Sequence, residues 1–127
     1  MFAYVGCFTT EKRKAKGKGV AIYRIDDAGK WTYVDVCDAL PNPSYISLDR
    51  KRQFLYSAHG DSDEVCAYAR DPRTGKLKFL NKQKTEGDNS STVEVDASNR
   101  WVLLSTGPGV ALFPIQADGT LGPYSDL

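Results

Sequence analysis

The sequence predicts an all-β fold, a partial β-propeller of about two and a half four-stranded antiparallel blades. Three observations predict it. One turn motif recurs after 46 and 44 residues, a second recurs after 47 residues, and hydrophobic residues between the turns alternate with a period of two. We expect one propeller portion over residues 1–127, with blade parts at 1–36, 44–84 and 92–127.

The first repeated motif is a strand end followed by a turn that contains glycine. It occurs at residues 23–31, 68–77 and 113–121. Glycine supplies the positive φ that a tight hairpin turn needs, so each copy predicts two adjacent antiparallel strands. The turn glycines are Gly29, Gly75 and Gly119.

The second repeated motif starts at an aspartate, Asp49 in one copy and Asp96 in the next. A short polar turn and a β-rich run follow each aspartate, which again indicates two antiparallel strands. One full repeat is therefore four strands, at about 45–48, 53–58, 64–70 and 76–83, and we expect essentially no helix. Large apolar residues are expected between stacked sheets, namely Phe54, Tyr56, Trp101, Leu103 and Phe113.

The strand inventory is smaller than that of a closed ring. We expect three strands before residue 36, four in the middle part and about three at the end. Closed propellers have about four to eight blades, so this chain alone leaves sheet faces and edges without partners. We therefore expect a fragment or a subunit, whose partners are the remaining blades of a propeller or further copies of the chain.

Composition and charge exclude several classes of protein. Lys and Arg total 17 against 16 Asp and Glu, so a net charge of +1 provides no overall field that would attract nucleic acid or a membrane. The amino terminus shows no secretory signal and no stretch has the length of a membrane span, so the predicted location is cytoplasmic. Three widely spaced cysteines, Cys7, Cys37 and Cys66, argue against a disulfide framework and a zinc site.

Four segments carry a family resemblance: YVG at 4–6, GVAIYRI at 19–25, NPSY at 42–45 and LFPIQADG at 112–119. In this order they resemble the propeller lactonases with seven blades, which include bacterial 6-phosphogluconolactonases and fungal carboxy-muconate cyclases. At about 46 residues a blade, such a ring needs roughly 320 residues, and this chain would be its amino-terminal third.

The resemblance implies an enzyme that hydrolyses a small anionic sugar lactone such as 6-phosphogluconolactone. Carboxy-muconate cyclase chemistry and a non-catalytic binding scaffold remain alternatives, because propellers have many functions. The catalytic residues stay unknown, since the family's histidine, arginine and glutamate motifs lie in later blades. Where related blades have Pro-Cys-His before an inner strand, this chain has Ser90-Ser91-Thr92, and His59-Gly60 stands where Asn-Glu would follow a second strand. The chain alone is expected to lack lactonase activity.

His59 and a basic run are the candidate substrate-binding residues. His59, the one histidine, lies in a loop between the second and third strands of a blade, where either a general base or, as the favoured interpretation, a solvated side chain is expected. The run 12–18, which includes Lys12, Arg13 and Lys14, is expected on the same rim. Its charges could attract a phosphorylated or carboxylated substrate over about 8 Å, or they could simply be solvated.

Other possible sites are poorly supported. Ser57, His59 and Asp61 are the residue types of a hydrolytic triad, but they are crowded into five positions, and a triad takes its groups from separate elements. Asp61, Asp63 and Glu64 lack the glycine and distal glutamate of a calcium loop. The Gly17-Lys18-Gly19 segment lacks the pattern of a nucleotide site, so neither cofactor nor metal is predicted.

Overall fold

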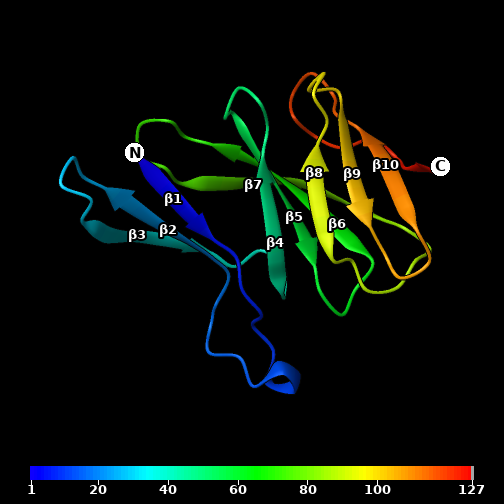
Figure 1. The fold of residues 1–127 in the computed structure, drawn as a ribbon, viewed down its shortest axis with the longest axis horizontal. Helices are drawn as coiled ribbons and strands as arrows, with labels where there is room; N and C mark the ends of the chain where they lie inside the picture. Colours follow the sequence, from blue (N-terminus) through cyan, green and yellow to red (C-terminus); the bar gives the residue numbers. More distant parts are fainter. Residues whose placement is uncertain (127) are drawn as a thin grey trace.

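The structure, a computed structural model, describes residues 1–126 and places eleven β-strands in three antiparallel sheets (Figure 1). The helical content of this part of the chain is one 3-10 turn of three residues, η1 (Glu11–Arg13). The predicted all-β partial propeller is therefore confirmed. No helix within residues 1–126 is long and apolar enough to cross a membrane.

Each sheet is a short meander of consecutive strands. The first sheet comprises β1 (Phe2–Val5), β2 (Val20–Ile25) and β3 (Trp31–Cys37). The second sheet comprises β4 (Pro43–Leu48), β5 (Phe54–His59), β6 (Glu64–Arg70) and β7 (Leu77–Lys84). The third sheet comprises β8 (Thr92–Val95), β9 (Trp101–Ser105), β10 (Val110–Pro114) and the two-residue β11 (Ser125–Asp126).

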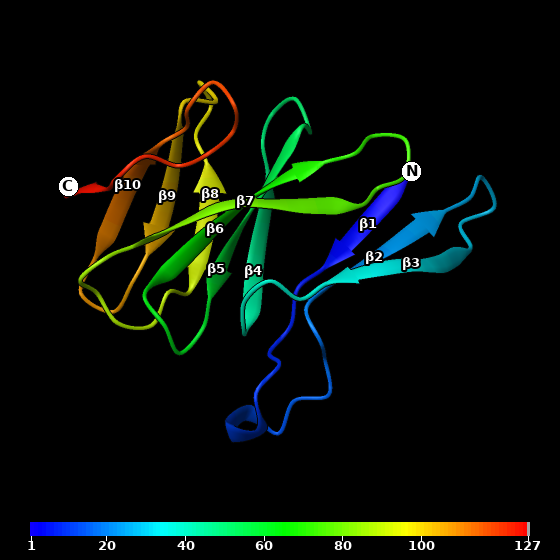
Figure 2. The same ribbon diagram turned by 180° about the vertical axis from the view of Figure 1, so that it is seen from behind.

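The three sheets lie side by side like neighbouring blades, with the second sheet between the other two (Figures 1 and 2). β4 and β8, the first strands of the second and third sheets, lie against each other. The glycine-turn repeat aligns the β2–β3 hairpin with the β6–β7 hairpin, so β1 corresponds to β5. The first sheet therefore has no counterpart of β4.

The core consists of two layers, one on each face of the second sheet. Because side chains alternate along a strand, Leu55 points into one layer and Tyr56 into the other. The layer toward the first sheet contains Leu55, Cys66 and Tyr68, packed against Tyr4 and other partly buried residues. The layer toward the third sheet is larger and includes Tyr56, Leu104 and Phe113.

Two residues expected between sheets lie elsewhere. Trp101 is 36% exposed and Leu103 is only partly buried, whereas Val102 and Leu104 are fully buried. In a strand, alternate residues face opposite sides, so Trp101 and Leu103 belong to the outer face of the third sheet, on which no sheet packs. The prediction was wrong for these two and is confirmed for Tyr56 and Phe113, which are fully buried.

The aspartate motif is a turn closed by the carboxylate itself. Asp49 Oδ1 accepts hydrogen bonds from the amides of Gln53 and Phe54, at 2.6 and 2.9 Å. Asp96 Oδ1 accepts the equivalent bonds from Arg100 and Trp101, at 3.0 and 2.9 Å. The predicted direction change at both aspartates is confirmed.

The loops form two rims at opposite ends of the strands. The first rim comprises the loops 6–19, 38–42, 60–63, 85–91 and 106–109, which bond to one another, for example through Gly107 N and Asp88 O at 2.8 Å. The second rim carries the glycine turns: Gly75 lies against Phe2, at the start of β1, and its carbonyl accepts a bond from the Tyr4 hydroxyl at 2.7 Å. The predicted separation of the basic run from Gly75 is thereby confirmed.

Candidate functional site

A polar hollow of about 290 Å³ opens on the first rim, beside the starts of β4 and β8. We call it the rim pocket. It takes residues from three loops and from the beginning of β4, and these residues are Phe8, Arg13, Ser44, Gly60, Asn89, Ser90 and Ser91. Because β4 and β8 adjoin, the pocket lies where the second and third sheets come together.

Asn42 holds three of the rim loops in register. It is 3% exposed and adopts a left-handed conformation with φ of 55°, which asparagine tolerates better than most residues. Its Oδ1 accepts a bond from Thr9 N at 2.8 Å, and its own N donates to Thr9 Oγ1 at 3.0 Å. Its Nδ2 donates to Gly60 O at 3.1 Å, so the loops before β2, β4 and β6 are tied together.

Arg13 is tied to Asp61 by two hydrogen bonds. Its Nε donates to Oδ2 at 2.8 Å and its Nη2 to Oδ1 at 2.6 Å, while the guanidinium lies 4.5 Å from the centre of the Phe8 ring. The hydrogen bond from Arg13 lowers the pKa of Asp61, and the same bond raises the pKa of Arg13. The pair is exposed to solvent, so its main effect is to orient the two loops rather than to stabilise the fold.

Ser90 contributes a hydroxyl with no hydrogen-bond partner. The residue is 1% exposed, and its Oγ is one of two buried side-chain polar atoms without a partner among the described residues. A buried hydroxyl that bonds to nothing costs free energy, so such a group needs an explanation. A second molecule that fills the rim pocket is one such explanation.

His59 lies at the same rim, but its ring is turned into the protein. Its Nδ1 lies 2.6 Å from Pro41 O and its Nε2 2.8 Å from Ser57 Oγ. Because a carbonyl oxygen only accepts, Nδ1 carries the proton and Nε2 accepts from the serine hydroxyl. Burial lowers the pKa of His59, which keeps the ring neutral.

The expectation of a solvated His59 was wrong: the residue ends β5 and is 1% exposed. The physical reason is that Pro41, in the loop that enters β4, supplies a carbonyl acceptor for Nδ1 of the ring. The proposed substrate contact of His59 therefore stays a prediction to which this geometry gives no support.

Ser57 and His59 form a hydrogen-bonded pair but not an accessible catalytic site. Ser57 is fully buried, and the Tyr68 hydroxyl lies 3.3 Å from its Oγ. Asp61 bonds to Arg13 rather than to the histidine, so it does not complete a triad. Burial also raises the pKa of the neighbouring Cys66 to about 12, which removes its thiolate at neutral pH.

Two acidic residues at the β5–β6 connection pair with cations of the chain itself. Asp61 pairs with Arg13, and Glu64 Oε1 lies 3.2 Å from Lys82 Nζ and 3.7 Å from Lys84 Nζ. Across residues 1–126, no group of three or more potential metal ligands comes together.

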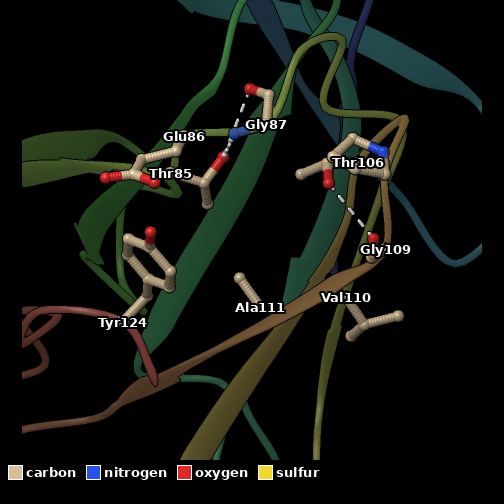
Figure 3. A pocket seen from close by; sticks show the side chains of 9 residues that line it. Thr85, Glu86, Gly87, Thr106, Gly109, Val110, Ala111 and Tyr124 are labelled. Carbon is tan, nitrogen blue, oxygen red and sulfur yellow. Dashed lines mark hydrogen bonds between the residues drawn. The ribbon is translucent and has the colours of Figure 1, made fainter. Parts of the chain in front are cut away.

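A larger hollow of about 470 Å³ lies farther along the first rim (Figure 3). Thr85 Oγ1 accepts a bond from Gly87 N at 3.0 Å, and Thr106 Oγ1 donates to Gly109 O at 3.2 Å, so both hydroxyls serve their own loops. Glu86 and Tyr124 are the ionisable residues of its lining. The rim pocket, by contrast, is lined by Ser90, whose buried hydroxyl has no partner among the described residues.

The basic run is placed as expected, but its members differ. Lys12 and Arg13 belong to η1, and Lys14 follows it with φ of 51°. Lys12 and Lys14 are exposed, and only Arg13 lines the rim pocket.

Sequence reasoning missed the serines of the pocket. Ser91 follows Ser44 by 47 residues, the same spacing as the two turn aspartates, and both serines precede or begin the first strand of a four-stranded sheet. This repeat-equivalent position was the available signal.

Comparison with known proteins places the whole chain in one group. The family profile described as "Lactonase, 7-bladed beta-propeller" matches residues 2–127. A 6-phosphogluconolactonase of Bacillus subtilis is 32% identical over 97% of this chain, which covers 36% of that protein. A 6-phosphogluconolactonase of Formosa agariphila is 27% identical over 93% of the chain and 35% of its own length.

Solved structures agree with these relatives. A Bacteroides fragilis protein provisionally assigned as a 6-phosphogluconolactonase superposes with a TM-score of 0.86 at 28% identity, over 98% of this chain and 35% of that one. A periplasmic gluconolactonase of Pseudomonas aeruginosa superposes with a TM-score of 0.83 at 25% identity, over 97% of this chain and 37% of that one. The chain thus spans about a third of the length of each of these relatives.

Proposed function

The chain belongs to the family of seven-bladed β-propeller lactonases. From this membership we propose that it takes part in the hydrolysis of a small anionic sugar lactone such as 6-phosphogluconolactone. The observation that carries the proposal is the match through residues 2–127 together with the 32% identity to the Bacillus subtilis enzyme over 97% of the chain. The relative from Pseudomonas aeruginosa, a gluconolactonase, supports a sugar lactone as the substrate, although gluconolactone itself is uncharged.

Within that activity, the part proposed for residues 1–127 is substrate binding at the first rim. The rim pocket contains hydroxyl, amide and guanidinium groups, which can orient a polar substrate. Among the described residues, the Ser57–His59 pair resembles a nucleophile and base, but it is buried. A site on a propeller axis takes groups from several blades, so we assign the reacting groups to other parts of a complete ring.

Hydrolysis of 6-phosphogluconolactone and of glucono-1,5-lactone by the 127-residue chain tests this division of roles. We expect no turnover above spontaneous ring opening, and turnover when the chain is joined to, or mixed with, the blades of a related lactonase that complete the ring. Hydrolysis by the chain alone would show that residues 1–127 contain the reacting groups. Absence of turnover in a completed, folded ring would contradict the proposed activity.

A further inference from the structure

We infer that the rim pocket is a subsite for the neighbouring hydroxyl groups of a polyhydroxy acid or its lactone. The inference takes the class of ligand from the proposed function. It goes beyond that function by assigning the residues of the subsite and the hydroxyl groups of the ligand that they bind. The rim pocket has a volume of about 290 Å³, just below the range of roughly 300 to 1,000 Å³ that is usual for ligand pockets, and it suits a ligand of single-sugar size.

The uncommitted hydroxyl of Ser90 points to a ligand that can both donate and accept hydrogen bonds. Ser90 Oγ is buried without a partner, and Ser44, which lies near Gly60, lines the same pocket. Asn89 adds an amide whose Oδ1 already accepts a long bond from Asp61 N at 3.3 Å. Serine hydroxyls and amides match the alternating donors and acceptors of sugar hydroxyl groups.

The same groups make the pocket a poor site for a carboxylate or phosphate. Three backbone amides around it are already used: Gly60 N donates to Asn42 O at 3.1 Å, Ser90 N to Ser62 O at 2.7 Å and Ser91 N to Ser105 O at 3.0 Å. The charge of Arg13 is matched by Asp61 at bonding distance. An anion would find neither a free cluster of amides nor an unpaired cation here.

Gly60 keeps the pocket open. A methyl group at this position would lie 2.6 Å from Phe8 Cε1 and 3.1 Å from Ser44 Oγ, so it would crowd these two lining side chains. Gly60 does not adopt a positive φ, so alanine is compatible with its backbone. The matched control is Gly109, on the same rim, where an added methyl group meets nothing within 4 Å.

The experiment measures binding of D-gluconate to the 127-residue chain by saturation-transfer NMR, with hexanoate and inorganic phosphate as hydroxyl-free anions. We expect millimolar binding of gluconate that weakens about threefold to tenfold in Ser90→Ala, is lost in Gly60→Ala and is unchanged in Gly109→Ala. Ser90→Ala should unfold at the same or a higher urea concentration than the parent, because its hydroxyl has no partner to lose.

Three results would overturn the inference. The first is no binding of gluconate, and the second is gluconate binding of equal strength to the parent, to Ser90→Ala and to Gly60→Ala. The third is binding of hexanoate or phosphate with the same sensitivity to these variants. The first two would leave water as the partner of Ser90, and the third would make the pocket an anion site. The subsite and the lactonase proposal fail separately. If gluconate binding is sensitive to the variants but a completed ring shows no turnover, only the proposed lactonase activity is contradicted. If a completed ring shows turnover with a KM unchanged by Ser90→Ala, only the proposed subsite is contradicted.

Discussion

His59 illustrates how one buried side chain fixes a loop junction. Its ring joins the end of β5 to the loop entering β4, through the proton on Nδ1 and the lone pair on Nε2. A charged imidazolium would be costly at this buried position, and burial lowers the pKa of His59 accordingly. Neighbouring Asn42 joins the same loops, so the rim pocket rests on a rigid base.

The lowered pKa of His59 predicts a stability change between about pH 7 and 5. Below the unfolded value of about 6.5, the unfolded chain binds a proton that the folded chain resists, so stability falls as pH falls, by at most about 1.4 kcal/mol per pH unit. His59 is the one histidine of the sequence, so few other groups titrate in this range. Urea unfolding at pH 7.5, 6.5 and 5.5 measures the effect.

His59→Asn serves as the comparison for this measurement, because an asparagine amide can still donate to Pro41 O but does not titrate. We expect the variant to be less stable than the parent at pH 7.5 and to lose the pH dependence. An identical slope in parent and variant would assign the dependence to other groups.

The aspartate turns show how one element is reused along the chain. Asp49 is 3% exposed and accepts from three backbone amides as well as from Asn99 Nδ2 at 3.0 Å, in the equivalent turn of the third sheet. Burial works to raise the pKa of Asp49, but the hydrogen bonds from Phe54, Asn99 and the turn amides outweigh it and lower the value. The turn therefore closes β4 onto β5 and joins two sheets.

Replacement of Asp49 by alanine should destabilise the fold by about 1–3 kcal/mol, because several donors lose a charged acceptor in a largely buried turn. Asp96→Ala, in the matching turn, should cost less, since Asp96 is more exposed and its carboxylate bonds only within its own turn. Denaturant midpoints of both variants check this order. Equal midpoints for the two variants would mean that the contact between sheets adds nothing.

At the scale of the whole molecule, the two outer sheets have unpartnered faces. Trp31 and Tyr33 of the first sheet are 52% and 58% exposed, and Trp101 and Val110 of the third sheet are 36% and 43% exposed. An apolar hollow of about 300 Å³, which includes Tyr33 and Val5, lies on the first sheet. Soluble monomers rarely expose such groups together, so these faces favour contact with further blades or further copies.

We therefore expect the 127-residue chain to self-associate, with a sedimentation coefficient that rises with protein concentration. The double variant Tyr33→Lys and Trp101→Lys should shift it toward monomer, because each change places a charge on one outer face. Tyr45→Lys is the control, since Tyr45 is 40% exposed but belongs to the second sheet, which has a neighbour on each side. A concentration-independent monomer for the parent would contradict the prediction.

The sequence by itself determined the fold class, the strand positions and the separation of the two rims, because aspartate and glycine turns act through neighbours a few residues away. Only the tertiary structure decided the site. The link between Arg13 and Asp61 joins residues 48 positions apart, and the bond from His59 to Pro41 depends on a loop of the neighbouring strand. Residue type and period predict which face of a strand a residue occupies, but not whether another sheet packs on that face, which is why Trp101 was misplaced. The unpartnered hydroxyl of Ser90 also depends on tertiary contacts and was not foreseen.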